Sequence, residues 1–153
     1  MSAFYRELDD EVVLDPTIGF FGTNVNLDET LRYGLELYFD FEANESLDLM
    51  LDYTLVNAEI DYGANDGETI PLVPHHQFNL GFDWHPTDYW TFIANVRYFS
   101  AYHAGGDFSN IAEELDGRVV VDLSVRYQLS ETSELFAGID NLTDKDYVST
   151  AIS

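Results

Sequence analysis

The side chains of this sequence alternate between apolar and polar with a period of two over most of its length. From Arg118 to Leu129, the odd-numbered residues are apolar and the even-numbered residues are mostly polar. The same alternation recurs, with less regularity in the last of them, over Tyr33–Glu42, Leu47–Leu55, Gln77–Trp84 and Phe92–Ser100. Only an extended strand sends alternate side chains to opposite faces. The pattern therefore predicts an all-β protein.

Two weaker strands, about Ala3–Asp15 and Glu134–Tyr147, bring the expected number to seven, with no helix of useful length. Tight turns are expected at Ala43–Ser46, His85–Asp88 and Ser130–Ser133. They alternate with longer polar loops at Pro16–Val25, Asp61–Pro74 and Ala104–Gly117. Short turns at one end and long loops at the other are typical of an up-and-down antiparallel meander. In outer-membrane barrels the short turns are periplasmic and the long loops are extracellular.

Aromatic residues lie near both ends of the expected strands. Phe41, Trp84 and Trp90 are next to the short turns, whereas Tyr62, Tyr98 and Tyr102 are near the long loops. Two aromatic levels around an apolar band are what two lipid–water interfaces select. Strands of about ten residues are long enough to cross a bilayer when tilted. The alternative is a soluble seven-stranded β-sandwich that acts as an acidic binding or adhesion module.

Seven strands cannot close an antiparallel meander, because the first and last strands then run in the same direction. Bacterial single-chain barrels have even strand numbers, and an open edge in hydrocarbon leaves backbone groups unpaired. The sequence therefore predicts a partial transmembrane β-barrel, about seven strands of a larger one. On this interpretation, further barrel strands precede Met1 and follow Ser153.

Composition excludes several classes of function. The chain has 29 Asp and Glu against 6 Lys and Arg, a formal net charge of −23, which repels the phosphate backbone of nucleic acids. Cysteine is absent, so disulfides, thiolate zinc sites and a cysteine nucleophile are excluded. No arrangement of residues predicts a catalytic site, a metal site or a cofactor. We therefore do not expect an enzyme.

Four segments resemble, in order and spacing, the C-terminal part of the β-barrel of TonB-dependent outer-membrane receptors. The first is Phe4-Tyr5-Arg6 followed by Asp9-Asp10-Glu11-Val12-Val13, and the second is Asn24–Thr30 followed by Arg32–Leu37. The third is Ile70-Pro71-Leu72-Val73-Pro74-His75-His76, and the fourth is Asp140-Asn141-Leu142-Thr143-Asp144-Lys145-Asp146-Tyr147. Thr143 stands where the family usually has Phe, and His75 where it usually has Arg. The match covers nearly the whole chain.

The resemblance implies a receptor in the Gram-negative outer membrane that imports a scarce ligand, above all a ferric siderophore or another iron complex. In this family the loops and an N-terminal plug bind the ligand, and the TonB complex pulls on the plug. Residues 1–153 would then be a C-terminal barrel fragment without the plug and without the final strand. A passive porin-like barrel that lacks a plug is the alternative within membrane proteins.

A few side chains are candidates for ligand contact. His75 and His76 are adjacent, so on a strand they would face opposite sides and could not chelate one ion together. Tyr102 and His103 are expected at the extracellular end of a strand, where ligands arrive. Asp61–Glu68 lacks the spacing of a calcium loop, and we interpret it as an acidic surface loop. Acidic loops can also bridge to lipopolysaccharide phosphates through divalent cations. Arg32, Arg97 and Arg126 are expected to pair with carboxylates on neighbouring strands.

Overall fold

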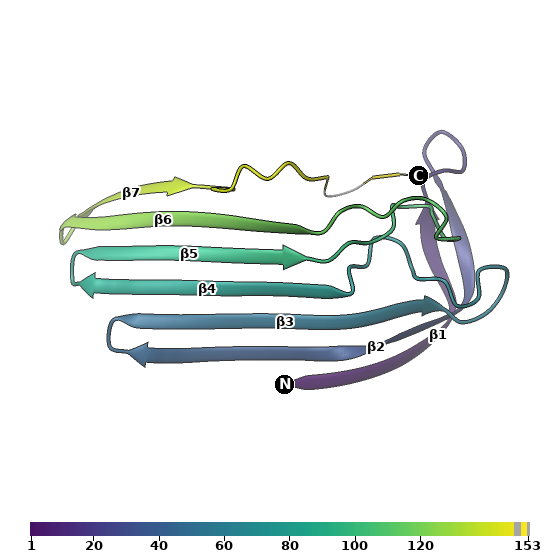
Figure 1. The fold of residues 1–153 in the computed structure, drawn as a ribbon, viewed down its shortest axis with the longest axis horizontal. Coiled ribbons are helices and arrows are strands. Elements are labelled where there is room, and N and C mark those ends of the chain that lie inside the picture. Colours follow the sequence, from purple (N-terminus) through teal and green to yellow (C-terminus); the bar gives the residue numbers. More distant parts are fainter. Residues whose placement is uncertain (149–150, 153) are drawn as a thin grey trace.

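The computed structural model describes residues 1–148, 151 and 152, and it contains seven strands in a single antiparallel sheet. The strands pair in the order in which they occur along the chain, as Figure 1 shows. They are β1 (Ser2–Asp15), β2 (Thr23–Asn44), β3 (Leu47–Ile60), β4 (His76–Thr87), β5 (Trp90–Phe99), β6 (Arg118–Ser130) and β7 (Ser133–Ile139). The predicted seven-stranded all-β meander is confirmed. No helix in the described part of the chain is long and apolar enough to cross a membrane.

The register places the apolar positions of successive strands side by side. For example, Leu51 pairs with Leu80, Leu80 with Val96, and Val96 with Val121. We call this side of the sheet the apolar face. Its central members are Leu35, Leu37, Phe39, Leu49, Leu51, Leu80, Phe82, Ala94, Val96, Val121, Leu123 and Val125.

The opposite side, the polar face, is mostly hydrophilic. Its members include Glu36, Asp40, Asp52, Asn79, Asn95, Arg97, Asp122 and Ser124. Asn79 Nδ2 donates to Asp52 Oδ2 over 3.3 Å, which ties β3 to β4 on this side. The described residues form no second sheet that could cover the apolar face, so the soluble sandwich is wrong.

The β1–β2 hairpin is longer than the alternation predicted. Thr23 already pairs with Asp15, so the expected loop Pro16–Val25 shortens to residues 16–22. The ladder omits the pair Asp10 and Asp28, and Asp10 has a φ of 56°. This irregularity exchanges the two faces, since Glu11, beyond it, bonds to Arg32 on the polar face. Loop-end residues of the hairpin, such as Val13 and Leu27, therefore continue the polar side of the sheet.

The last strand is shorter than predicted. The alternation favoured a strand over Glu134–Tyr147, but the ladder with β6 ends at Ile139. Asn141 and Asp144 have left-handed backbone angles, with φ of 51° and 49°, which turn the chain away from an extended path beside β6. The backbone N–H of Asn141 donates to Asp122 Oδ1 over 2.8 Å, so a side chain replaces the expected ladder partner. The motif Asp140–Tyr147 thus forms a turn rather than the end of a strand.

Aromatic rings on the apolar face confirm the level expected near the short turns. Trp84 contacts Phe92 with ring centroids 5.4 Å apart, and Trp90 contacts Tyr127 at 4.5 Å. Near the long loops, Tyr98 lies on the apolar face as expected, and Tyr62 is an exposed loop residue. The prediction that Tyr102 belongs to this level is wrong, because Tyr102 is only 4% exposed and its hydroxyl accepts a hydrogen bond from Arg118. Tyr5 and Tyr33, which pair across β1 and β2, stand at this end of the sheet.

We predict that Gly34→Ala weakens the β2–β3 pairing. A Cβ at this position would overlap the carbonyl oxygen of Leu55 and lie 2.8 Å from the Phe4 ring. Backbone cannot move aside cheaply, so the free energy of unfolding should fall by about 1–3 kcal/mol. Gly81→Ala is the matched control, because its Cβ would be 3.4 Å from Met50 Cβ. Urea unfolding of the variants measures the difference; equal stability of the two would contradict the assignment.

Candidate functional site

The three long connections, residues 16–22, 61–75 and 100–117, gather at one end of the sheet, and we call them the loop cap (Figure 1). Beneath them lies a small core of four buried residues, Leu27, Ala58, Ile60 and Ile70. Partly buried Val13, Val56, Val73 and Phe108 pack against it. The core joins strand residues of β2 and β3 to residues of two cap loops. The cap is therefore folded against the polar face.

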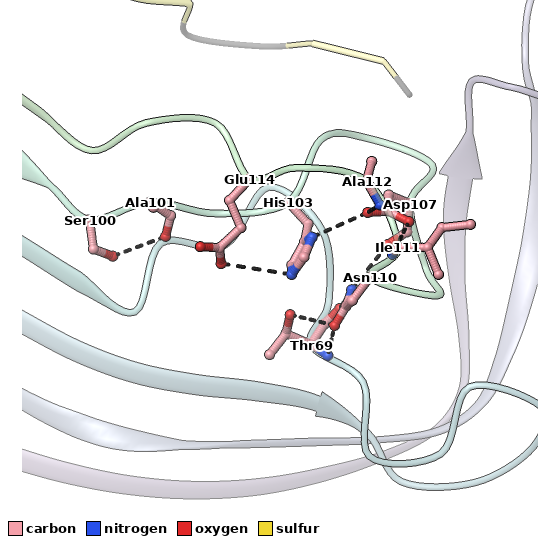
Figure 2. Close-up of polar contacts among 9 residues, drawn as sticks. All are labelled: Thr69, Ser100, Ala101, His103, Asp107, Asn110, Ile111, Ala112 and Glu114. Carbon is pink, nitrogen blue, oxygen red and sulfur yellow. Dashed lines mark hydrogen bonds and ion pairs between the residues drawn. The ribbon is translucent and has the colours of Figure 1, made fainter.

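Thr69 and Asn110 join two of the cap loops (Figure 2). Asn110 Oδ1 accepts from the backbone N–H of Thr69 over 2.6 Å and from its hydroxyl over 2.8 Å. Asn110 Nδ2 donates back to the Thr69 carbonyl over 3.0 Å. Asn110 has a φ of 50°, a conformation that Asn tolerates better than most residues. A single side chain thus satisfies both backbone groups of Thr69.

Asp107 organises the turn that presents Asn110. It is 5% exposed, and its carboxylate accepts from the backbone N–H groups of Ile111 and Ala112, each over 3.1 Å. His103 Nδ1 lies 3.2 Å from Asp107 Oδ2, and its Nε2 lies 3.7 Å from Glu114 Oε1, as Figure 2 shows. The backbone carbonyl of His103 accepts from the N–H of Leu72. His103 is therefore enclosed by its own loop rather than directed to solvent.

The tip of loop 100–117 also meets the hairpin loop 16–22. Gly106 has a φ of 92°, and a Cβ there would overlap the methyl group of Thr17. Thr17 is itself held by Asp15, whose Oδ1 accepts from the Thr17 backbone N–H over 2.9 Å and from its hydroxyl over 2.6 Å. Only glycine allows this approach. All three cap loops are thus in contact through loop 100–117.

The predicted ligand residues have separate sets of partners. His75 Nδ1 is 3.2 Å from Asn57 Oδ1, and His76 Nδ1 is 2.9 Å from the Tyr53 hydroxyl, so both rings lean on β3. His103 contacts two carboxylates of its own loop. These contacts hold the rings of His75 and His76 against β3 and the ring of His103 within the loop cap. The prediction that they meet a ligand stays untested.

Tyr102 belongs to a cluster of rings around Arg118. Arg118 Nη1 donates to the Tyr102 hydroxyl over 2.9 Å. The guanidinium carbon lies 4.4 Å from the centroid of the Phe99 ring and 5.1 Å from that of Tyr147. Cation–π contacts of this kind hold an arginine without a carboxylate partner. The cluster joins the base of loop 100–117 to the segment that follows β7.

Of the three arginines expected to pair with carboxylates, Arg32 and Arg97 do so, whereas Arg126 forms no ion pair within the described part of the chain. Arg32 forms a two-pronged contact with Glu11, with nitrogen–oxygen distances of 2.7 and 2.9 Å. Arg97 pairs with Asp122 across β5 and β6. Among the described residues, no group of three or more His, Asp or Glu could hold a metal ion.

Sequence reasoning missed Asp107, Asn110 and Arg118. The nearby Asp107, Ser109 and Asn110 are a weak turn signal, and Asn favours left-handed positions. However, Asn110 acts on Thr69, which is 41 residues away, and no spacing rule connects them. Arg118 is the first residue of β6, and its place in the alternating pattern of that strand gave no reason to expect a role for its guanidinium group.

Comparisons with known proteins agree with this architecture. Residues 1–142 match the family model described as TonB dependent receptor-like, beta-barrel. Over 123 residues, the chain is 30% identical to the iron-regulated outer membrane virulence protein of Vibrio cholerae serotype O1, covering 80% of this chain and 19% of that protein. The chain thus spans about a fifth of the length of this relative.

Solved structures show the same fold. The crystal structure of the ferric-catecholate import receptor Fiu from Escherichia coli K12 superposes with a TM-score of 0.77 at 24% identity, covering 98% of this chain and 21% of that one. BauA, the ferric preacinetobactin receptor from Acinetobacter baumannii, gives 0.72 at 27% identity, covering 95% of this chain and 23% of that one.

We predict that Asn110→Gly uncouples the two loops of the cap. Glycine accepts the positive φ without strain but removes the hydrogen bonds to Thr69, at a cost of about 2 kcal/mol. Amide hydrogen exchange in residues 61–75 and 100–117 should then accelerate about thirtyfold. Ser109→Gly, next to it and exposed, is the control and should leave exchange in residues 61–75 unchanged. Exchange that stays slow in Asn110→Gly would contradict the junction.

Proposed function

The chain belongs to the TonB-dependent receptor family, as part of its β-barrel, and from that premise we propose that the protein carrying it imports a scarce iron complex across the outer membrane. Receptors of this family are outer-membrane proteins. The observation that carries the proposal is a match to the family model over 142 residues, on a sheet with one apolar and one polar face.

The two faces of the sheet suit a barrel wall. The apolar face would contact lipid, with the rings of Trp84, Phe92, Trp90 and Tyr127 at the periplasmic interface. The polar face would line the lumen, where the charges of Arg97 and Asp122 remain hydrated. The loop cap then lies at the extracellular mouth.

The names of the relatives support an iron complex as the ligand. They include an iron-regulated outer-membrane protein, a ferric-catecholate import receptor and a ferric preacinetobactin receptor. We propose a ferric siderophore or a related chelate, which would meet the loop cap near His75, His76, Tyr102 and His103. The protein would be a transporter and not an enzyme.

Three further partners follow from the same proposal. A plug domain outside this chain would fill the lumen and receive the pull of the TonB complex. Lipid would cover the apolar face. Lipopolysaccharide would contact the acidic loops through bridging divalent cations.

Leu123→Asp tests the membrane part of the proposal. Leu123 lies on the apolar face, so the change places a carboxylate in lipid and should cost on the order of 2 kcal/mol of barrel stability. Ser124→Asp, one residue further, points to the polar face and should assemble normally. The amount of folded, heat-modifiable receptor in outer membranes distinguishes them. Equal assembly of both variants would contradict the orientation of the sheet.

Uptake of radioactive iron tests the transport part. A strain that expresses the full-length receptor as its only iron receptor should accumulate iron from ferric catecholates. The same strain without TonB should lose at least nine-tenths of this uptake, because the driving energy comes from the inner membrane. Uptake that persists without TonB would instead support the passive porin-like barrel.

A further inference from the structure

One residue of the loop cap has a backbone conformation that does not suit its side chain. Five non-glycine residues in the described part of the chain have a positive φ, and four of them are Asp or Asn. The fifth is Leu72, with a φ of 63°. Asp and Asn tolerate this left-handed region because their short polar side chains can bond locally, whereas leucine has no such compensation. The surroundings of Leu72 must therefore impose its conformation.

The sequence around Leu72 favours a different form of the same turn. Pro71 and Leu72 are the central residues of this turn, and proline in the first of these positions suits both common turn types. In a type I turn the second central residue has a φ of about −90°, which leucine adopts readily. In a type II turn it has a φ of about +80°, which requires Gly or Asn. The positive φ places Leu72 in the second type, which leucine disfavours.

Loop 100–117 supplies the interaction that selects the disfavoured turn. The backbone N–H of Leu72 donates to the carbonyl oxygen of His103 over 2.9 Å. The two turn types differ mainly by a rotation of the peptide unit between their central residues, and the N–H of this unit is that of Leu72. The bond to His103 therefore fixes the orientation that gives Leu72 its positive φ. The Leu72 side chain also packs on this loop, since its Cδ1 lies 3.3 Å from the position that a Cβ of Gly105 would take.

Both ends of the turn are attached to β3. The N–H of Ile70 donates to the Ala58 carbonyl over 2.9 Å, and the N–H of Val56 donates to the His75 carbonyl over 3.0 Å. Ile70 is buried, whereas Leu72 is 43% exposed. The exposed centre of the turn can therefore rotate between fixed ends, without movement of the rest of loop 61–75.

We propose that the peptide unit between Pro71 and Leu72 is a two-state switch that responds to the docking of loop 100–117. When the loop is docked, the His103 carbonyl binds the N–H of Leu72 and the turn is of type II. When the loop leaves, the peptide unit rotates and Leu72 takes the negative φ that leucine prefers. The Pro71 carbonyl then points where the N–H pointed, so it faces the His103 carbonyl and opposes renewed docking. Each form of the turn thus stabilises one state of the cap.

The switch acts against the hydrogen bonds that join the same two loops. Asn110 binds both backbone groups of Thr69, in the same loop as Leu72. The strain at Leu72 opposes this attachment, so the cap is closed less firmly than its hydrogen bonds alone would make it. The inference concerns the cap itself and depends on neither the transported ligand nor the proposed membrane orientation.

Amide hydrogen exchange of the full-length receptor in detergent tests the switch. Leu72→Asn and Leu72→Ala both remove the contact of the leucine methyl groups with Gly105, but only asparagine suits a type II turn. Exchange in residues 100–117 should be about fivefold slower in Leu72→Asn than in Leu72→Ala, because alanine resists a left-handed conformation that asparagine tolerates. Ala64→Asn is the matched control, since Ala64 is exposed in the same loop and does not have a positive φ. It should leave exchange in residues 100–117 at the wild-type rate.

Two results would overturn the switch. Equal exchange in Leu72→Asn and Leu72→Ala would show that the turn stores no strain at residue 72. An equal slowing in Ala64→Asn would show that asparagine acts on the loop in general and not through the turn. Iron uptake plays no part in the measurement, so a failure of the transport proposal is recognised separately from a failure of the switch.

Discussion

A shift of one residue in the pairing of any two strands would turn the apolar side chains of one strand to the polar face. Every other property of this sheet depends on that register. It aligns Leu51, Leu80, Val96 and Val121 across four strands, and it places Arg97 and Asp122 together on the opposite side. In a membrane the same pairing satisfies the backbone groups that lipid cannot bind. The short turns maintain it, since each allows little freedom for slippage.

The loop cap is held by a different kind of interaction. Its buried core is small, and polar contacts supply its specificity. Asn110 satisfies both backbone groups of Thr69, and Asp107 binds the backbone of the turn that presents Asn110. Gly106 permits the contact with Thr17. The cap therefore depends on a few side chains with exact geometry, whereas the sheet depends on a repeated pattern that tolerates many substitutions.

This difference explains what the sequence could predict. A period of two identifies strands, so the alternation predicts all seven, and the residues of the apolar face follow from it. The two errors of length have local causes. The irregularity at Asp10 and Asp28 exchanges the two faces of the β1–β2 hairpin, so the alternation does not reveal the first residues of β2. The left-handed conformation of Asn141 stops the pairing of β7 within a segment whose sequence still alternates. Tyr102 is expected at the lipid interface, but it is buried and its hydroxyl is bound by Arg118. Contacts between loops that are far apart in the sequence, such as that of Thr69 with Asn110, produce no periodic pattern of residues from which they could be predicted.

The distance along the chain between Thr69 and Asn110 also bears on the order of assembly. Strands joined by two-residue turns can pair progressively, starting from residues only a few positions apart in the sequence. The hydrogen bonds between Thr69 and Asn110 instead close a loop of 41 residues. That closure becomes favourable only after β4 and β5 have brought the two connections to the same end of the sheet. Folding of the strands should therefore precede folding of the cap. An assembly intermediate would have a complete sheet with open loops, which a protease could cleave before the folded cap protects them.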